Sequence, residues 1–205
     1  MTDKDTWTKD LWVEHTVEET QSIYRDWAAT YDADVLNSGY VTPQRIAAAL
    51  ADTTVPKDAA ILDFGCGTGL AGLALAEAGF QTVDGTDISP EMLDQAHQRD
   101  VYRDLVLGKA GTIAFETGAH QAVVAAGVVS AGAAPPATLA LLVHHLTTGG
   151  RLALSFNDPS LKMGTYDVEL DRLVANGLVE VQFREHGPHL PEKGMGSDVI
   201  VLRRL

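Results

Sequence analysis

The spacing of apolar and polar positions changes near residue 59 of this 205-residue chain. Before that point apolar residues recur at helical spacing, which predicts helices over about 17–29 and 42–51. After it, short apolar runs alternate with helical stretches. This alternation predicts an α/β fold with a mostly parallel sheet, helices on both faces and right-handed crossovers. The expected strands cover about 59–64, 81–86, 103–107, 121–126, 151–156, 178–186 and 197–203, and the expected helices 69–79, 90–100, 137–146 and 165–175.

The same pattern sets the expected domain organisation. We expect a loosely ordered N-terminus over residues 1–15 and a single domain over residues 16–205. Within that domain, residues 16–55 form an N-terminal helical cap and residues 56–205 form the alternating core. Thr42 and Pro43 are the expected cap and first turn of the second helix, because proline suits the start of a helix.

Composition narrows the choice of partners. The formal net charge is −13, so a phosphate backbone should be repelled and we expect no nucleic acid partner. The N-terminus has no apolar core typical of a signal peptide, so we expect a cytoplasmic protein. The uncharged stretch 122–143 is long enough to cross a bilayer, but it is rich in Ala and Gly and Pro135-Pro136 interrupts it, so we expect no membrane span.

The strongest local signal is a glycine-rich turn between a strand and a helix. Gly65, Gly67 and Gly69 follow the apolar strand that contains Asp63. Glycine allows sharp turns and close approach of a ligand to the backbone, and the helix start presents unpaired N–H groups. The alternative is a structural turn without a ligand. The arrangement predicts a nucleotide-like cofactor at the carboxyl end of the first strand.

Two acids indicate which cofactor binds. A carboxylate at Asp63 would repel a pyrophosphate and attract an ammonium group, although it could also only fix the turn. Asp87 ends the second strand, where a carboxylate can accept hydrogen bonds from both hydroxyls of a ribose. Capping of the helix near Ser89 is the alternative role for Asp87. Together the two acids favour an adenosyl amino acid over a dinucleotide.

These motifs resemble those of the class I S-adenosylmethionine (SAM)-dependent methyltransferases. Asp63-Phe-Gly-Cys-Gly-Thr-Gly is similar to their first motif, and Asp87-Ile-Ser-Pro-Glu-Met-Leu to the motif after their second strand. The resemblance implies a Rossmann-like seven-stranded sheet with the order 3-2-1-4-5-7-6, SAM as cofactor and S-adenosylhomocysteine as product. Two further segments, Trp27-Ala-Ala-Thr-Tyr-Asp-Ala-Asp-Val and Gly187-Pro-His-Leu-Pro, resemble the methyltransferase-like group of the Williams-Beuren region.

The resemblance also implies roles for other residues around the cofactor. Ile88 and Met92 are candidates to pack on adenine, with simple core packing as the alternative. Many relatives place an acid after the third strand, but this chain has Lys109 and Ala110 there, and lysine cannot accept a hydrogen bond. Backbone groups or Glu116 would then have to bind the adenine amino group. The remaining candidates for the cofactor site are Cys66 as apolar filler, Ala126 beside the sulfonium and Tyr31 above it.

No residue stands out as catalytic, because methyl transfer mainly requires alignment of donor and acceptor and exclusion of water. His189, His186 and Tyr31 are the candidates, since the N-terminal segment 20–40 and the segment 185–194 should reach the cofactor edge as a lid and a loop. The alternative is a fixed packing helix and a solvated hairpin loop. His144 and His145 are adjacent on a helix, so we expect no metal site.

We therefore expect a SAM-dependent methyltransferase acting on a small-molecule acceptor. Two other functions compete with it. A SAM-binding protein without transfer activity is favoured slightly by the missing adenine acid. An NAD-dependent oxidoreductase is disfavoured by Asp63 and by the absence of a Tyr-x-x-x-Lys pair.

Overall fold

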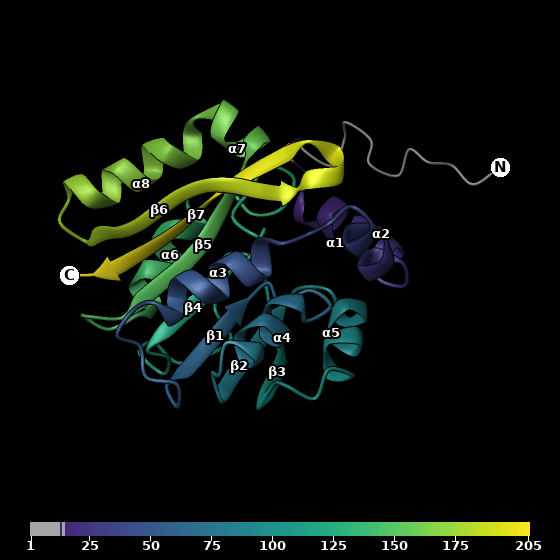
Figure 1. Ribbon diagram of the computed structural model, residues 1–205, viewed down its shortest axis with the longest axis horizontal. Coiled ribbons are helices and arrows are strands. Elements are labelled where there is room, and N and C mark those ends of the chain that lie inside the picture. The colour runs from purple at the N-terminus through teal and green to yellow at the C-terminus, as the bar shows by residue number, and fades with distance from the viewer. Residues whose placement is uncertain (1–12, 14) are drawn as a thin grey trace.

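A computed structural model describes residue 13 and residues 15–205, so the expectation for residues 1–15 falls largely outside the described chain. Seven strands in the described part form one sheet with the order β3-β2-β1-β4-β5-β7-β6 (Figure 1). The strands are β1 (Ala60–Phe64), β2 (Thr82–Asp87), β3 (Asp104–Leu107), β4 (Ala122–Ala125), β5 (Arg151–Asn157), β6 (Val179–Leu190) and β7 (Met195–Arg204). The helices are α1 (Val17–Trp27), α2 (Tyr31–Asn37), α3 (Thr42–Ala51), α4 (Leu70–Glu77), α5 (Pro90–His97), α6 (Thr138–His145), α7 (Asp158–Met163) and α8 (Thr165–Ala175), with a 3-10 turn, η2 (Pro191–Lys193).

Strand direction brings the ends of the central strands together. β1 is parallel to β2 and β4, and the parallel pairing continues to β3 on one side and β5 on the other. β7 is antiparallel to both of its neighbours, β5 and β6. The strand order implied by the resemblance, including its antiparallel last strand, is confirmed. Because parallel strands end at one edge, residues that follow β1, β2, β4 and β5 gather there.

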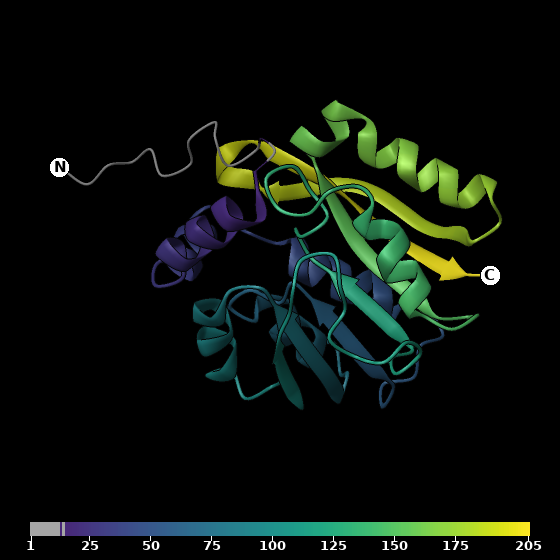
Figure 2. The same ribbon diagram turned by 180° about the vertical axis from the view of Figure 1, so that it is seen from behind.

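Helices cover both faces of the sheet, as the alternation predicts. Ile61 of β1 packs in the same cluster as residues of α3 and α4, whereas the next residue, Leu62, packs with residues of α6 and α8. Figure 1 shows α3 and α4 in front of the sheet, and Figure 2 shows α6 and α8 from behind. Central strands buried on both faces are rich in Val, Leu and Ala for this reason.

The uncharged stretch 122–143 divides into β4, an irregular segment that contains Pro135 and Pro136, and the first part of α6. No helix in the described part of the chain is long and apolar enough to cross a membrane.

Two short helices were missed by the sequence pattern. α2 and α7 have seven and six residues, too few to display a clear helical period. α7 begins directly after β5, where Asn157 Oδ1 accepts a hydrogen bond from Ser160 N at 3.0 Å. Thr42 is the first residue of α3 rather than its cap, and its hydroxyl bonds to His189 instead. The expected cap at Ser89 is confirmed, since its Oγ accepts from Met92 N at 3.3 Å.

The C-terminal hairpin differs from the expected loop. β6 continues to Leu190 and η2 joins it to β7, so the segment 185–194 is largely paired strand and tight turn. Gly187 and Pro188 obscure this strand in the sequence. Proline is tolerated here because β6 is the edge strand of the sheet.

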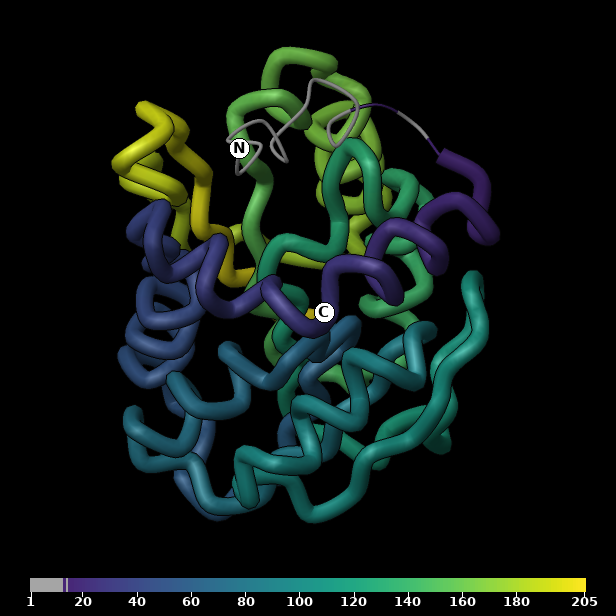
Figure 3. The backbone as a smooth tube through the Cα atoms, turned by 90° about the vertical axis from the view of Figure 1, so that its right-hand side faces the viewer, coloured from purple at the N-terminus to yellow at the C-terminus, as the bar shows by residue number. Residues whose placement is uncertain are grey.

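The N-terminal helices lie across the edge where the parallel strands end. α1 starts with a capping box, in which Thr16 Oγ1 accepts from Glu19 N at 3.2 Å and Glu19 Oε2 accepts from Thr16 N at 2.8 Å. Figure 3 shows purple α1 and α2 lying across the molecule, between the teal segments on one side and the green and yellow segments on the other. The N-terminal segment therefore covers the junction of the two halves of the sheet.

A buried polar network supports β2 away from that edge. Asp84 accepts from Arg103 Nε at 2.9 Å and contacts His120 Nε2 at 2.9 Å, while His120 Nδ1 lies 3.0 Å from His145 Nε2. Burial, reinforced by repulsion from His120, lowers the pKa of His145 to about 4. Asp84 is thus a structural acid, and His145 is buried whereas the adjacent His144 is exposed.

Candidate active site

The glycine turn has the conformation that its sequence requires. Gly65, Gly67 and Gly69 have φ values of 66°, 53° and 90°, which side chains disfavour. The N–H groups of Gly65 and Cys66 donate to Thr86 O at 2.8 and 3.0 Å, which fixes the turn against the end of β2. α4 begins directly afterwards, so its N-terminus faces the same edge of the sheet.

Gly65 and Gly67 are required for different reasons. A Cβ at Gly65 would lie 2.5 Å from a methyl group of Val128, so this glycine is required by packing. A Cβ at Gly67 would meet nothing within 4 Å, so the backbone there borders open space. Gly67 is therefore where a ligand could approach the peptide groups.

Asp63 is buried beneath the turn with only 1% of its surface exposed. Its Oδ2 accepts from the hydroxyl of Tyr102 at 2.7 Å, and its Oδ1 is buried without a hydrogen-bond partner among the described residues. Burial, opposed by the hydrogen bond from Tyr102 and aided by the nearby Asp87, raises the pKa of Asp63 to about 7. A half-satisfied buried carboxyl group of this kind is suited to a ligand that brings a positive charge.

Asp87 lies at the end of β2 and accepts hydrogen bonds from the backbone of both the glycine turn and the start of α5. Its Oδ2 accepts from Gly67 N at 2.8 Å, and its Oδ1 accepts from Ser89 N at 2.9 Å. Burial raises the pKa of Asp87, opposed by these backbone hydrogen bonds. A carboxylate has about four lone-pair sites, so the two amides leave capacity for two hydroxyl donors. Capping and ribose binding are therefore compatible at this residue.

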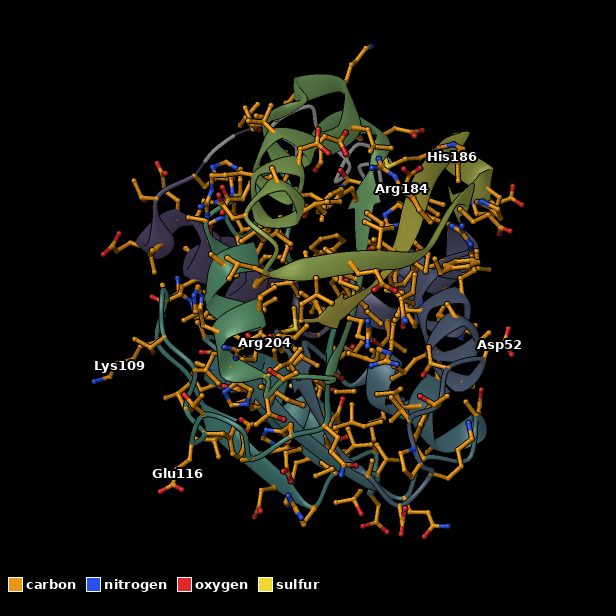
Figure 4. All side chains as sticks on the ribbon, turned by 90° about the vertical axis from the view of Figure 1, so that its left-hand side faces the viewer. Asp52, Lys109, Glu116, Arg184, His186 and Arg204 are labelled. Carbon is orange, nitrogen blue, oxygen red and sulfur yellow. The ribbon has the colours of Figure 1, made fainter. Side chains whose placement is uncertain are left out.

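The other residues expected to contact the cofactor differ in how deeply they are buried. Cys66 and Met92 are buried below the turn and in α5, and burial raises the pKa of the Cys66 thiol, which fits an inert filler. Ile88 and Ala126 are partly buried at the strand ends. Lys109 and Ala110 are exposed, and Figure 4 shows the Lys109 side chain pointing away from the molecule. Glu116 also points outward in Figure 4, so it does not fold back toward the glycine turn.

α1 and α2 are tied to the core by polar contacts. The Gln21 amide donates to Ile88 O at 3.2 Å. Asp32 of α2 accepts from Thr68 Oγ1 at 2.5 Å and forms an ion pair with Arg99, which itself donates to Thr68 O at 3.1 Å. These contacts hold the two helices over the glycine turn and the start of α5.

The inner side of α1 and α2 is aromatic. The Trp27 ring lies 4.7 Å from that of Tyr31 and 6.3 Å from that of Tyr24, measured between centroids. Burial raises the pKa of Tyr24 to about 12 and that of Tyr31 well above its usual value. Both phenols therefore stay neutral at physiological pH, and their rings offer negative faces to a cation.

A small cavity of about 50 Å³ lies below these rings. It brings together Tyr31, Asn157 and His189, which are far apart in the chain but meet at the end of the sheet. No Asp, Glu, Lys or Arg occurs among the described residues that line it. The lining consists of Tyr24, Trp27, Tyr31, Val35, Tyr40, Gly127, Ser130, Ala131, Asn157, His189 and Leu190.

The two candidate histidines lie in different surroundings. His189 is buried beside Tyr40, with its Nδ1 at 2.7 Å from Thr42 Oγ1. Burial lowers the pKa of His189 to about 4. His186 does not line the cavity: it is exposed on the hairpin (Figure 4), with its Nδ1 at 2.9 Å from Asp198 Oδ1.

Sequence reasoning missed two tyrosines at this edge. Tyr102 reaches under the glycine turn to Asp63, and this requires Gly72, because a Cβ there would lie 2.4 Å from the Tyr102 ring. Tyr40 lines the cavity, and its hydroxyl lies 3.1 Å from where a Cβ of Gly127 would be. A glycine inside a helix, such as Gly72, was the one local sign of a close approach.

Comparisons with known proteins agree with this geometry. Residues 61–150 match a family model described as a methyltransferase domain. The chain is 33% identical over 165 residues to human methyltransferase-like protein 27, covering 77% of this chain and 67% of that protein. It is 44% identical over 78 residues to the 18S rRNA (guanine-N(7))-methyltransferase of Bos taurus, covering 37% of this chain and 27% of that protein. A solved SAM-dependent methyltransferase of Leishmania major superposes with a TM-score of 0.69 at 17% identity, covering 91% of this chain and 82% of that chain.

The protein is therefore an enzyme that transfers methyl groups. It belongs to the class I SAM-dependent methyltransferases, and its cosubstrate is SAM. The residues at the edge of the sheet fit that molecule, since an unpaired buried carboxyl oxygen and an open glycine backbone both lie within a few residues of the end of β1. SAM supplies an electrophilic methyl group on a sulfonium, and the chain supplies alignment and a dry surrounding.

Proposed function

We propose that the protein methylates a small molecule bound in the cavity below α1 and α2. The observation that carries this proposal is the convergence of Tyr31, Asn157 and His189 on one cavity at the edge where the parallel strands end. A cavity of about 50 Å³ admits only the reacting group of an acceptor. The net charge of −13 also disfavours a nucleic acid acceptor.

In this proposal the glycine turn and its two acids hold SAM. Asp63 pairs with the methionine ammonium group, because its buried Oδ1 has no other partner among the described residues. Asp87 accepts the ribose hydroxyls while its amide contacts keep it in place. Ile88 and Met92 border the adenine, and backbone groups at residues 108–110 replace the acid that many relatives have there.

Tyr31 and Ala126 take the sulfonium end. The aromatic faces of α1 and α2 attract the positive charge, and the small side chain of Ala126 leaves room for an acceptor. The segments Trp27-Ala-Ala-Thr-Tyr-Asp-Ala-Asp-Val and Gly187-Pro-His-Leu-Pro supply these surroundings. We further place the chain nearest to the Williams-Beuren methyltransferase-like group on account of those two segments.

Binding and turnover test this function directly. Calorimetry should show heat of binding for SAM and S-adenosylhomocysteine and none for NAD. Incubation with methyl-labelled SAM and a metabolite extract should then label a small product. An 18S rRNA fragment serves as the competing acceptor, because the Bos taurus relative is an rRNA methyltransferase by name. Labelled RNA with no labelled metabolite would overturn the small-molecule assignment.

We also propose that α1 and α2 act as a lid. A small number of polar contacts tie them to the core and their aromatic side faces the cavity, which suits a segment that opens and closes over a ligand. Hydrogen exchange over residues 20–40 should slow when SAM is added, while β5 stays equally protected. Asp32→Asn should speed exchange of the same segment, whereas Asp26→Asn, whose carboxyl is exposed, is the matched control. Equal protection of residues 20–40 with and without SAM would contradict the lid.

A further inference from the structure

His189 is directed toward the cavity by an irregularity in the hairpin. The β6–β7 register pairs Pro188 with Gly196 and then Leu190 with Met195, so His189 is an extra residue between the two pairs. Its carbonyl oxygen instead accepts from Val41 N at 3.2 Å. A bulge of this kind turns a side chain away from the normal alternation, and such bulges are common beside active sites.

A row of hydroxyl groups links the His189 ring to an arginine. His189 Nδ1 lies 2.7 Å from Thr42 Oγ1, which lies 3.3 Å from Ser197 Oγ. Ser197 Oγ accepts a hydrogen bond from Arg45 Nη1 at 3.2 Å. Thr42 and Ser197 are both 0% exposed, so their hydrogen bonds must be satisfied within the protein.

Arg45 determines which hydroxyl group donates and which accepts along this row. A guanidinium group only donates, so the Ser197 hydroxyl hydrogen cannot point back to Arg45. The one other contact of Ser197 Oγ in the described chain is Thr42 Oγ1, which must therefore accept from Ser197. Thr42 then donates to His189 Nδ1. The opposite direction would leave the buried Ser197 hydrogen without an acceptor, which is the costlier arrangement.

We propose that His189 carries its proton on Nε2 and offers the cavity a hydrogen-bond donor rather than a base. Thr42 and Ser197 are the positioning residues that fix this tautomer. On the proposed function, which this inference requires, the acceptor is a neutral planar heterocycle. It has a carbonyl oxygen or second ring nitrogen that His189 binds, and it attacks through an unprotonated ring nitrogen.

The rest of the cavity has matching chemistry. Asn157 Oδ1 is occupied by Ser160, while its amide nitrogen has no hydrogen bond with the described chain, so it can be a second donor. No carboxylate side chain is present among the described lining residues to take a proton, and the neutral His189 has its lone pair directed at Thr42. The cavity therefore suits an attacking atom that has no proton to lose.

The balance of electrons and charge in methyl transfer is consistent with attack by a ring nitrogen. Its lone pair forms the bond to the methyl carbon as the carbon–sulfur bond breaks and that electron pair stays on sulfur. The positive charge passes to the heterocycle, and no proton moves. Tyr24, Trp27, Tyr31 and Tyr40 surround this position with aromatic faces, which stack on a flat ring and attract the cation that forms.

Nitrogen NMR of the full chain with ¹⁵N-labelled histidine tests the tautomer. His189, assigned through His189→Gln, should show a protonated Nε2 and an unprotonated Nδ1, unchanged between pH 6 and 8. Thr42→Val should remove that preference, and Thr42→Ser should restore it. A protonated Nδ1 in the wild-type protein would overturn the proposal. So would an identical signal in the wild-type and Thr42→Val proteins.

The charge of the product tests the acceptor class. The labelled product from methyl-labelled SAM and metabolite extract should be a heterocycle methylated on a ring nitrogen, which is a cation below the pKa of any N–H that the ring retains. A neutral methyl ether, ester or thioether as the sole labelled product would refute it, because those products form on oxygen or sulfur and not on a ring nitrogen. Calorimetry on the same protein distinguishes a failure of the proposed function from a failure of the His189 proposal. Absent SAM binding counts against the proposed function, whereas the NMR result judges His189 without any turnover.

Discussion

The cofactor side and the acceptor side of this edge are built in opposite ways. Asp63, the three glycines, Asp87 and Ser89 lie within 27 consecutive residues, 63–89, on one strand–turn–helix–strand unit. The cavity takes residues from α1, α2, the segment after β4, the end of β5 and the β6 bulge. The first kind of site is a property of local backbone geometry. The second exists only after distant segments have packed together, so one can vary between relatives while the other persists.

The two sides also differ in charge. Two carboxyl groups with raised pKa values, the buried Asp63 and the partly buried Asp87, lie on the cofactor side. The acceptor side has neutral phenols and a neutral imidazole, because burial raises the pKa of Tyr31 and lowers that of His189. A cationic cosubstrate is therefore held by charge at its amino acid end and by aromatic faces at its reacting end.

The largest expected effect comes from Gly65→Ala. The added Cβ would lie 2.5 Å from Val128 at a φ of 66°, combining overpacking with a left-handed backbone. These should lower the free energy of unfolding by about 3 kcal/mol or more. Gly67→Ala is the matched variant, since its Cβ meets nothing within 4 Å. It should lower the unfolding free energy by only ~1–2 kcal/mol but weaken SAM binding, because it fills space beside the cofactor.

Urea unfolding and calorimetry on both variants check this pair. Equal losses of stability would show that Val128 moves aside and that packing does not distinguish the two glycines. Unchanged SAM affinity in Gly67→Ala would remove this stretch of backbone from the cofactor site.

The second-largest effect is expected at Asp87, the carboxylate proposed to bind the ribose hydroxyls. Asp87→Ala should weaken SAM binding by about 1.5–3 kcal/mol, the usual scale for hydrogen bonds to a charged group. The fold should persist, although Gly67 N and Ser89 N lose their acceptor. Calorimetry measures the affinity, and circular dichroism controls for folding. If affinity is unchanged while stability falls, Asp87 is only a cap and holds no ribose.

What the sequence could predict follows the same division. Spacing predicts the alternation of strands and helices and the glycine turn, whereas the strand order was accessible only through the resemblance. Tyr31 was placed near the cofactor through the resemblance, and His189 was placed there because the segment 185–194 was expected to reach the carboxyl ends of the strands. The bulge at His189 could not be predicted, because it depends on the register between β6 and β7. The Tyr102–Asp63 bond depends in the same way on a loop packing under α4.

The pH dependence of binding sharpens the role of Asp63. Its pKa of about 7 means that the unliganded protein is increasingly protonated there below neutral pH. An ammonium group needs the carboxylate, so SAM affinity should fall toward tenfold per pH unit below 7, or ~1.4 kcal/mol per unit, and level off above 8. Asp63→Asn should bind more weakly and lose this dependence. A wild-type affinity that is constant from pH 6 to 8 would contradict the ammonium contact.

The same shift affects stability with the opposite sign. The pKa of Asp63 is raised from 3.8 to about 7 by burial, so the folded state binds a proton more tightly than the unfolded chain. That contribution is complete below pH 3.8 and is lost as pH rises toward 7. Binding should therefore gain from alkaline pH while the unliganded fold loses this one contribution, and saturation with SAM should reduce the loss.

The smallest expected effect is at the adenine end, where the cofactor side departs from its relatives. Lys109 is exposed and points into solvent, and the neighbouring Gly108 N donates to Asp87 O at 2.8 Å, which positions the backbone of the loop (Figure 4). If backbone groups contact adenine, Lys109→Ala should change SAM affinity by less than about 0.5 kcal/mol, the usual scale of a surface substitution. Ala110→Pro, which removes a backbone N–H and restricts the loop, should weaken binding more.

A tenfold loss in Lys109→Ala, ~1.4 kcal/mol, would instead show that the lysine side chain reaches the cofactor when it binds. The adenine contact would then depend on loop movement, as the acceptor side depends on the lid, and the two sides would differ less than their unliganded geometry indicates.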